Sequence, residues 1–480
     1  MRNKFEKISN RKFFAISFAV PFLYWSLRIL IKSQNTFNLD TYWALNEIDK
    51  VGLFAGKFDV LYPWLSTLIT YLTTFGAKGM RLYGEGVTFD YVNFAILFMI
   101  ITMSFALAYL ALQINRQKYG SKLFSLFIVI IFSFFPLISE YVVSKGGKDT
   151  YFLVSLILFL ALFLEILETK CKCLKDKKFI SKFIIAATLV SLLRPNAIFA
   201  LILFLLILLI VYKKYWKCIG LACVLLLITI FVVNLGATKI FNLNNSDAPN
   251  YEIQYYNPIG TQRLMVEYVY YNKLTVKEEQ KSFFTSLQSA DKWAEDYYPW
   301  DMPHQDGVPR FTKYSSGAFY KEDFINFEKN WFLLGLQHPL AYFTAFFDGT
   351  RATWDPIFSY CSQPMVSEME TYSIEKCQYI SLSGSLSSNI LHSFVNIVKS
   401  IITNFSLVFW IFIIFLVISI VKKKKDFVVL ISLPLCYLFS ILISFGSTWM
   451  FRYIYPIISC FIIIIPLMIH ELWIFRKINK

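Results

Sequence analysis

The chain has 480 residues, of which 56% are hydrophobic, 19% aromatic and 16% charged. Soluble domains carry about 25% charged residues, so this composition excludes a single soluble core and indicates a polytopic membrane protein. The formal net charge of +15 does not indicate a nucleic-acid-binding protein. The basic residues lie in short clusters between apolar runs, as they do in cytoplasmic loops.

Apolar segments of spanning length recur along the whole chain, and in chain order they cover residues 13–31, 90–113, 122–142, 151–168, 179–193, 196–212, 217–236, 399–421, 427–446 and 450–473. Because only helices and closed barrels satisfy their backbone inside a bilayer, we expect an all-α polytopic membrane protein with about ten transmembrane helices. The first segment follows a basic tail and precedes no small-residue cleavage site, so it is predicted to be a retained signal anchor.

An eleventh apolar segment, residues 60–77, includes Tyr62 and Pro63 near its start. If it crossed the membrane, the lysine clusters at 116–122, 170–182 and 422–425 would face outward, against the positive-inside bias. If it lies on the outer surface, those clusters face the cytoplasm. We therefore predict an interfacial or re-entrant helix on the outside, with both termini in the cytoplasm of a bacterial cell.

This topology divides the chain into a seven-span N-terminal part (1–236, with a first outside loop at 32–89), an extracytoplasmic segment (237–398) and a three-span C-terminal part (399–480). The extracytoplasmic segment carries 18 acidic residues against 12 Lys plus Arg, unlike the basic inside loops. Its pattern predicts helices over 261–287 and 321–337. An aromatic loop at 293–314 separates them, and a further helix starts at Pro339.

Asp40 follows the first span at the predicted outer boundary, with Glu47 and Asp49 shortly after it. A carboxylate placed there is a candidate general base, because a sugar hydroxyl is a weak nucleophile that gains from proton removal as it attacks. Neighbouring aromatic residues would raise the basicity of a shielded carboxylate. The alternative is that these are solvated loop carboxylates.

Residues 145–150, Lys-Gly-Gly-Lys-Asp-Thr, form a predicted outside turn that is rich in lysine where the bias disfavours it. Lys145 and Lys148 would bind phosphate as point charges, and glycines let the backbone approach a ligand closely. In the alternative, Lys148 and Asp149 only pair and flank the start of a helix.

Two arginines interrupt apolar sequence on the same predicted face: Arg194 before Pro195, and Arg452 at the start of the last span. An arginine at such a depth is costly unless it is paired, hydrated or functional. With the two lysines, they could converge on one phosphate. The alternative for each arginine is snorkelling to lipid headgroups.

Other polar residues give weaker signals. Asp301, His304 and Asp306 meet no fixed metal-binding motif, so polar residues of a surface loop, or contacts with the acceptor, are favoured over a metal site. Arg263 and Arg351 are further candidates for substrate contact. No metal and no other cofactor is assigned. Disulfide formation between Cys361 and Cys377, the two cysteines of the predicted outside segment, stays open.

Short matches spread along the chain resemble the C-type (GT-C) membrane glycosyltransferases, which use polyprenyl-phosphate sugars. The matching pieces are Asp40 with Trp43, Tyr62-Pro63, Lys148-Asp149-Thr150, Leu193-Arg194-Pro195-Asn196, His338-Pro339 with Tyr342, and Arg452-Tyr453 with Pro456. The chain departs from the family pattern in two places. Thr41 stands where a second adjacent acid is usual, and Tyr62-Pro63 stands where a His-Pro pair is common.

The resemblance implies an inverting sugar transfer at the outer leaflet of the plasma membrane, onto an extracytoplasmic glycan, lipid or cell-wall polymer. It implies Asp40 as the base and Lys145, Lys148, Arg194 and Arg452 as ligands of the donor phosphate. Other candidates for substrate contact, selected from the sequence itself, are Asp49, Tyr62, Asp149, Arg263, His304 and Arg351. A glycan polymerase or ligase and a non-enzymatic flippase of lipid-linked sugars are the competing functions. A scaffolding membrane protein is a less favoured alternative, because such a protein has no reason to place these four basic residues on one face.

Overall fold

The computed structural model describes residues 5–31, 64–73, 89–118, 120–144, 147–194, 196–241, 260–297, 321–355, 404–445 and 451–478. Within these ranges all regular structure is helical and no strand occurs. The chain divides into two compact units. The first unit comprises residues 1–245, 416–437 and 455–480, and the second comprises 246–415 and 438–454.

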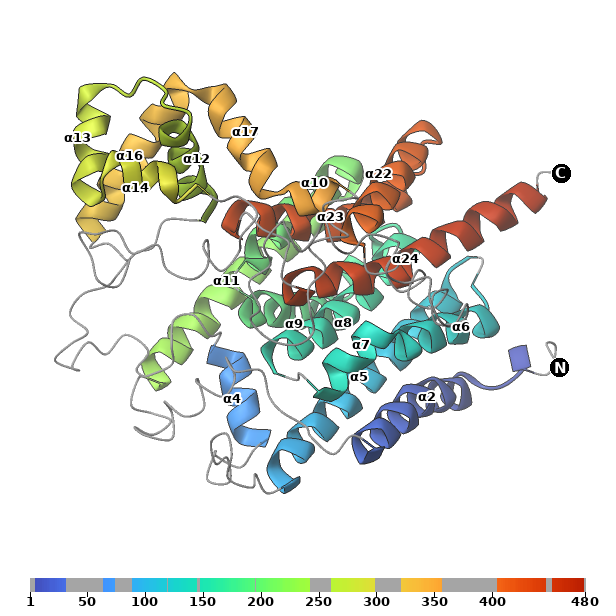
Figure 1. The fold of residues 1–480 in the computed structure, drawn as a ribbon. Coiled ribbons are helices and arrows are strands. Elements are labelled where there is room, and N and C mark those ends of the chain that lie inside the picture. The colour runs from blue at the N-terminus through green and yellow to red at the C-terminus, as the bar shows by residue number, and fades with distance from the viewer. Residues whose placement is uncertain are drawn as a thin grey trace, which may run out of the picture. The chain divides into compact units, whose positions relative to one another are not determined.

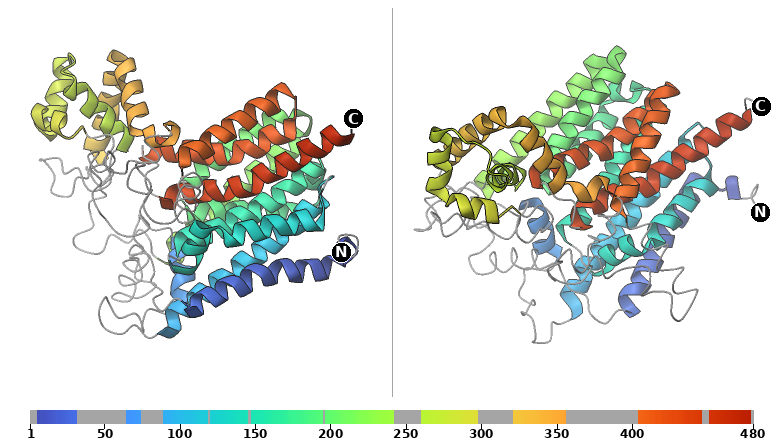
Figure 2. Two further views of the ribbon diagram at one scale, coloured as in Figure 1. Left: turned by 45° about the vertical axis from the view of Figure 1, so that its right-hand side comes forward. Right: turned by 45° about the horizontal axis from the view of Figure 1, so that its top comes forward.

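The first unit is a bundle of apolar helices that pack in chain order. Helices α2 and α5 are in contact, as are α5 and α8, and α8 and α9, so these four lie side by side (Figures 1 and 2). The N-terminal helices of the unit are α2 (Asn10–Ile31), α4 (Trp64–Thr73), α5 (Phe89–Arg116), α6 (Lys122–Phe134), α7 (Pro136–Ser144), α8 (Lys148–Glu168), α9 (Lys177–Leu193), α10 (Ala197–Val211) and α11 (Trp216–Ile240). Two short 3-10 turns, η1 (Lys172–Lys175) and η2 (Lys213–Tyr215), join some of them.

Six helices of the described chain are long and apolar enough to cross a membrane: Asn10–Leu30, Phe94–Arg116, Lys148–Glu168, Lys213–Ile240, Lys425–Ile443 and Ile454–Leu472. Three shorter apolar helices accompany them: Lys122–Phe134, Ala197–Val211 and Phe405–Val421. The expectation of a helical fold is therefore confirmed for the described residues, and the six apolar helices are those expected of a membrane protein. The count of about ten spans and the outside position of the 60–77 segment, in which α4 lies, stay predictions.

The segment predicted as one span over 122–142 is instead two helices. Helix α6 ends at Phe134, and Phe135 adopts an extended backbone with φ −62° and ψ 117° before α7 begins at Pro136. The residue before a proline is pushed out of the helical region by the proline ring, which also lacks the amide hydrogen that a continuing helix needs. Pro136 therefore explains the break.

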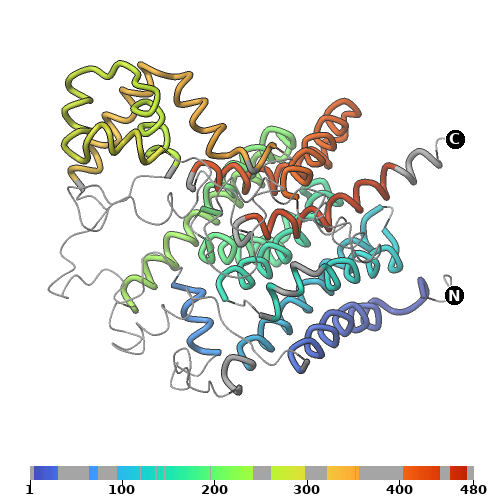
Figure 3. The backbone as a smooth tube through the Cα atoms, in the orientation of Figure 1, coloured from blue at the N-terminus to red at the C-terminus, as the bar shows by residue number. Residues whose placement is uncertain are grey.

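The second unit contains a helical subdomain, whose helices run from yellow-green to orange in Figure 3. It packs around its own aromatic core. Its helices are α12 (Gly260–Tyr271), α13 (Glu278–Leu287), α14 (Ala290–Glu295), α16 (Lys321–Gln337), α17 (Pro339–Gly349) and α18 (Arg351–Trp354). The buried core comprises Val266, Val269, Tyr270, Phe284, Leu287, Trp293, Phe327, Leu334 and Tyr342. At the contact between α16 and α17, a Cβ atom on Gly335 would lie 2.7 Å from the Tyr342 ring, so the glycine permits this close approach.

The predicted helices at 321–337 and from Pro339 are confirmed by α16 and α17. The single helix predicted over 261–287 is wrong, because α12 ends at Tyr271 and α13 begins only at Glu278. Between them Lys273 adopts a left-handed backbone with φ 52°, a conformation that terminates helices. Of the loop predicted over 293–314, the first residues belong to α14, and residues 298–314 lie outside the described ranges.

The C-terminal helices α22 (Phe405–Val421), α23 (Lys425–Phe445) and α24 (Phe451–Ile478) each contribute residues to both units. In the first unit, α23 supplies Tyr437 and α24 supplies Tyr455, and both are buried. These two residues bring the C-terminal part of the sequence next to groups from α7, α8 and the end of α9, as described below.

Candidate functional site

Arg194 is the central cation of a buried polar cluster in the first unit. It directly follows α9 and has an extended backbone with φ −145° and ψ 119°. The next residue in the sequence is Pro195, so the same steric effect that breaks the chain at Phe135 accounts for the end of α9. Only 5% of Arg194 is exposed. A guanidinium buried to this degree in a membrane helix bundle needs compensating partners.

Asp149 and Tyr437 supply those partners. The Arg194 Nη2 group donates to Asp149 Oδ1 in an ion pair, and Nη1 donates to the Tyr437 hydroxyl oxygen at 2.9 Å. Phe152, one turn after Asp149 on α8, lies under the guanidinium with its ring centroid 5.4 Å from Arg194 Cζ, and it stacks on Tyr437 at 5.2 Å. Carboxylate, hydroxyl and aromatic face together hold the arginine in one orientation.

A pair of buried tyrosines adjoins this cluster. The rings of Tyr141, from α7, and Tyr455, from α24, stack with centroids 4.5 Å apart. The Tyr455 hydroxyl lies within electrostatic range of the Asp149 carboxylate. Residues from α7, α8, α9, α23 and α24 therefore meet around one ion pair.

The first turn of α8 adds further features that suit an anion. Gly147 precedes this 21-residue helix and has a φ of 128°, a backbone conformation that glycine adopts without steric strain. It makes no side-chain cap to the helix. Lys148 is half-buried on the first turn. The amide groups at a helix N-terminus and the helix dipole favour negative charge, and Asp149 supplies one negative charge in this first turn, next to Lys148 in the sequence.

Two buried polar groups near the cluster make no hydrogen bond within the described part of the chain. They are the Thr150 hydroxyl, on the first turn of α8, and the Asn196 amide nitrogen, just before α10. Buried polar groups are usually hydrogen-bonded, and a ligand or ordered water is one way to satisfy them.

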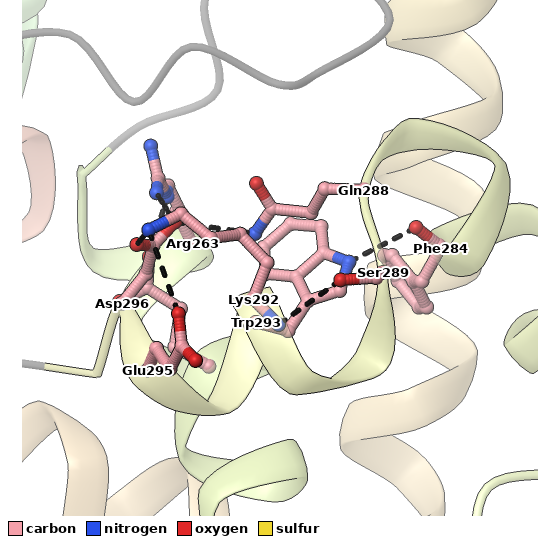
Figure 4. Close-up of polar contacts among 9 residues, drawn as sticks. Arg263, Phe284, Gln288, Ser289, Lys292, Trp293, Glu295 and Asp296 are labelled. Atoms are coloured by element: carbon pink, nitrogen blue, oxygen red, sulfur yellow. Dashed lines mark hydrogen bonds and ion pairs between the residues drawn. The ribbon is translucent and has the colours of Figure 1, made fainter.

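A second buried charge cluster lies in the helical subdomain of the second unit (Figure 4). Arg263 Nε donates to Glu267 Oε1 at 2.5 Å, and Arg263 Nη2 donates to Asp296 Oδ2 at 3.0 Å. Lys292 Nζ also lies 2.9 Å from Asp296 Oδ1. Arg263, Glu267 and Asp296 are each less than 8% exposed, so this network is interior and ties α12 to the end of α14.

The stability of this subdomain is expected to depend on pH through Glu267. Burial raises the pKa of Glu267 to about 7 from 4.5, although Arg263 opposes the shift. Between these two pH values the folded state binds more protons than the unfolded state. The free energy of unfolding should therefore fall as pH rises from about 4.5 to 7, by at most about 1.4 kcal/mol per pH unit from this group.

The check is denaturant unfolding of detergent-solubilised protein at a series of pH values. Glu267→Gln should flatten the decline over this interval, whereas Glu279→Gln, at an exposed position of α13, should leave it unchanged. An equal decline in the parent protein and the Glu267→Gln variant would show that Glu267 does not titrate in this way.

The remaining predicted site residues are not brought together by the described structure. Asp40, Asp49, Tyr62, Lys145 and His304 lie outside the described residues, as do Cys361 and Cys377. Arg452 lies on the first turn of α24, but its side chain is not among those described. Arg351 is exposed on α18, and its Nε donates to Asp355 Oδ2 at 2.8 Å. Within the described ranges, no group of three or more His, Cys, Asp or Glu side chains could hold a metal ion.

The cluster also includes residues that the sequence reasoning did not select, namely Tyr141, Phe152, Tyr437 and Tyr455. Each lies in an apolar segment among many other aromatic residues, so no local signal distinguishes it. Only helix packing shows that Phe152 and Tyr437 contact Arg194 and that the Tyr141–Tyr455 pair adjoins them.

The described part of the chain is all-helical and contains six helices that are long and apolar enough to cross a membrane, which indicates a polytopic α-helical membrane protein. Residues 70–472 match a family described as a family of unknown function (DUF6020), and the chain belongs to this family. No curated protein matches the chain. No solved structure matches it either.

Proposed function

We propose that this protein is a membrane glycosyltransferase that moves a sugar from a polyprenyl-phosphate donor to an extracytoplasmic glycan, lipid or cell-wall polymer. The observation that supports the proposal most directly is the buried Arg194, which Tyr437 and Asp149, in the first turn of α8, hold in one orientation. Cations gathered at the end of membrane helices suit a lipid-linked phosphate, whose tail occupies the bilayer while its charge needs a polar partner.

In the proposed reaction, the acceptor hydroxyl oxygen attacks the anomeric carbon of the sugar, and the bond from that carbon to the phosphate oxygen breaks. Asp40 takes the hydroxyl proton as the new bond forms, and polyprenyl phosphate leaves with the electron pair. Attack opposite the leaving group inverts the anomeric configuration. Lys148 and Arg194 stabilise the charge that grows on the phosphate, and Lys145 and Arg452 are further candidates for this role.

The donor site is tested with the full chain in nanodiscs and a radiolabelled polyprenyl phosphate. Lys148→Gln should weaken binding about tenfold, because it removes a positive charge next to the helix N-terminus without changing the length of the side chain much. Lys182→Gln, at an exposed position of α9, is the matched control and should bind like the parent protein. Equal affinity of all three proteins would remove Lys148 from the donor site.

The reaction itself is tested by supplying labelled polyprenyl-phosphate sugars and membrane-derived acceptors, and following the label. Transfer of label into an acceptor with release of polyprenyl phosphate supports the proposal. Movement of intact labelled lipid between leaflets without transfer would favour a flippase. Growth of a long polymer from an oligosaccharide donor would favour a polymerase.

A further inference from the structure

The helical subdomain of the second unit contains a surface pocket of about 430 Å³. None of the residues that line it belongs to the Arg194 cluster. Its lining includes Tyr268, Tyr271, Asn272, Glu295, Tyr297 and Asp348. These residues lie in the last turn of α12, α14 or α17, or within two residues after it. Nothing in the proposed transfer reaction uses this pocket.

Three tyrosines that pack on one another are among the residues that line the pocket. Tyr297 meets Tyr268 edge to face at 5.2 Å and Tyr271 at 5.1 Å between ring centroids. Tyr297 is buried, whereas Tyr271 is 56% exposed and leaves ring surface open to a ligand. An aromatic face carries partial negative charge, so rings arranged in this way attract a cation that has shed part of its water.

The charged groups of the pocket are acidic. Asp348 Oδ2 accepts a hydrogen bond from the Tyr297 hydroxyl at 2.9 Å, and Glu295 lies at the exposed rim. Burial raises the pKa of Tyr297 above its ordinary value, so its hydroxyl remains a donor at neutral pH. No lysine or arginine is among the described residues that line the pocket, although Lys292 approaches Glu295 to 3.8 Å from outside it.

The helix ends strengthen this negative field. The C-terminus of a helix carries partial negative charge, and cations are the groups that stabilise it. At these two helix C-termini the charged residues are acidic instead of basic: Asp348 lies in the last turn of α17, and Glu295 is the last residue of α14. Acids at helix C-termini are unfavourable unless a cation offsets them, as Lys292 does in part for Glu295. A neutral sugar would gain little from such a field, and an anionic lipid phosphate would be repelled by it.

We propose that this pocket binds an organic ammonium group, with Tyr268, Tyr271 and Tyr297 facing the cation and Asp348 and Glu295 balancing its charge. The same chemistry occurs in a soluble alkylammonium compound and in the headgroup of a zwitterionic lipid. Either source fits the lining residues.

The test uses the full chain in nanodiscs of phosphatidylglycerol, which offers no ammonium group, with choline as the probe and calorimetry or saturation-transfer NMR as the readout. Choline should bind, and dimethylbutanol, its neutral carbon analogue, should not. Tyr271→Ala should weaken choline binding about fivefold, and Tyr271→Phe should keep it within about twofold, because the ring face is preserved. Asp348→Asn should also weaken binding.

Phe332→Ala is the matched control, since Phe332 is a similarly exposed aromatic residue on α16 at 58% exposure. It should leave choline affinity unchanged. Including phosphatidylethanolamine in the nanodiscs separates the two sources: weaker choline binding there identifies a lipid headgroup as the ligand, and unchanged binding identifies a soluble one. Equal binding of dimethylbutanol, displacement of choline by N-acetylglucosamine, or full choline affinity in the Tyr271→Ala variant would overturn the proposal.

Discussion

Replacing Arg194 with Ala is expected to lower the free energy of unfolding by about 3–5 kcal/mol. The substitution leaves the Asp149 carboxylate, which is 3% exposed, without the guanidinium that compensates its charge. It also removes the hydrogen bond to Tyr437 and the cation packed on Phe152. Denaturant unfolding of the detergent-solubilised protein measures the change, and Lys182→Ala on the exposed face of α9 is the control.

The double variant Asp149→Asn with Arg194→Met separates a charge effect from lost packing. If the ion pair dominates, removing both charges should cost less than the sum of the two single substitutions, since neither charge is then buried alone. Arg194→Lys should fall between the parent protein and Arg194→Ala, because a lysine keeps the charge but loses the planar fork. A loss of less than about 0.5 kcal/mol for Arg194→Ala would show that Asp149 is compensated in some other way.

Replacing Asp40 with Asn is expected to reduce sugar transfer by about 10²–10⁴-fold, the range over which a general base contributes to catalysis. The amide is similar in size to the carboxylate but cannot take the proton of the acceptor hydroxyl at neutral pH. Binding of polyprenyl phosphate should be retained, because Asp40 is proposed to act on the acceptor and not on the donor phosphate. The measurement is the initial transfer rate in nanodiscs at saturating donor.

Glu47→Gln is the matched control for Asp40→Asn, since Glu47 is a nearby acid in the same segment to which no catalytic role is assigned. It should transfer sugar at the parent rate. Retained transfer in Asp40→Asn would exclude Asp40 as the base, and loss of donor binding in that variant would indicate a role in binding in place of proton transfer.

The two buried charge clusters differ in how many of their contacts can be predicted from the spacing of residues in the sequence. Arg263 and Glu267 are four residues apart and pair along one turn of α12, so their spacing alone permits the contact. Asp296 comes from beyond two helix breaks, and its pairing with Arg263 depends on how α14 packs against α12. The sequence reasoning selected Arg263 for substrate contact, whereas the structure places its guanidinium inside the subdomain between two carboxylates.

The sequence by itself was enough to predict a helical membrane protein, because hydropathy and charge are properties of short segments. Runs of apolar residues predict membrane helices wherever they occur, and Pro339 predicts a helix start because a proline at the first turn loses no hydrogen bond. Lys148, Asp149 and Arg194 could be selected for the same reason: charged residues at the ends of apolar segments are costly and need a cause.

Only the tertiary structure decided which of these residues meet. Arg194 pairs with an acid 45 residues before it and with a hydroxyl 243 residues after it, and no local pattern encodes contacts over such separations. Helix packing turns Phe152 and Tyr437, two aromatics among many, into neighbours of one cation. The pocket at Tyr297 likewise exists only because three helices end at the same place, which adds their partial charges to those of Asp348 and Glu295.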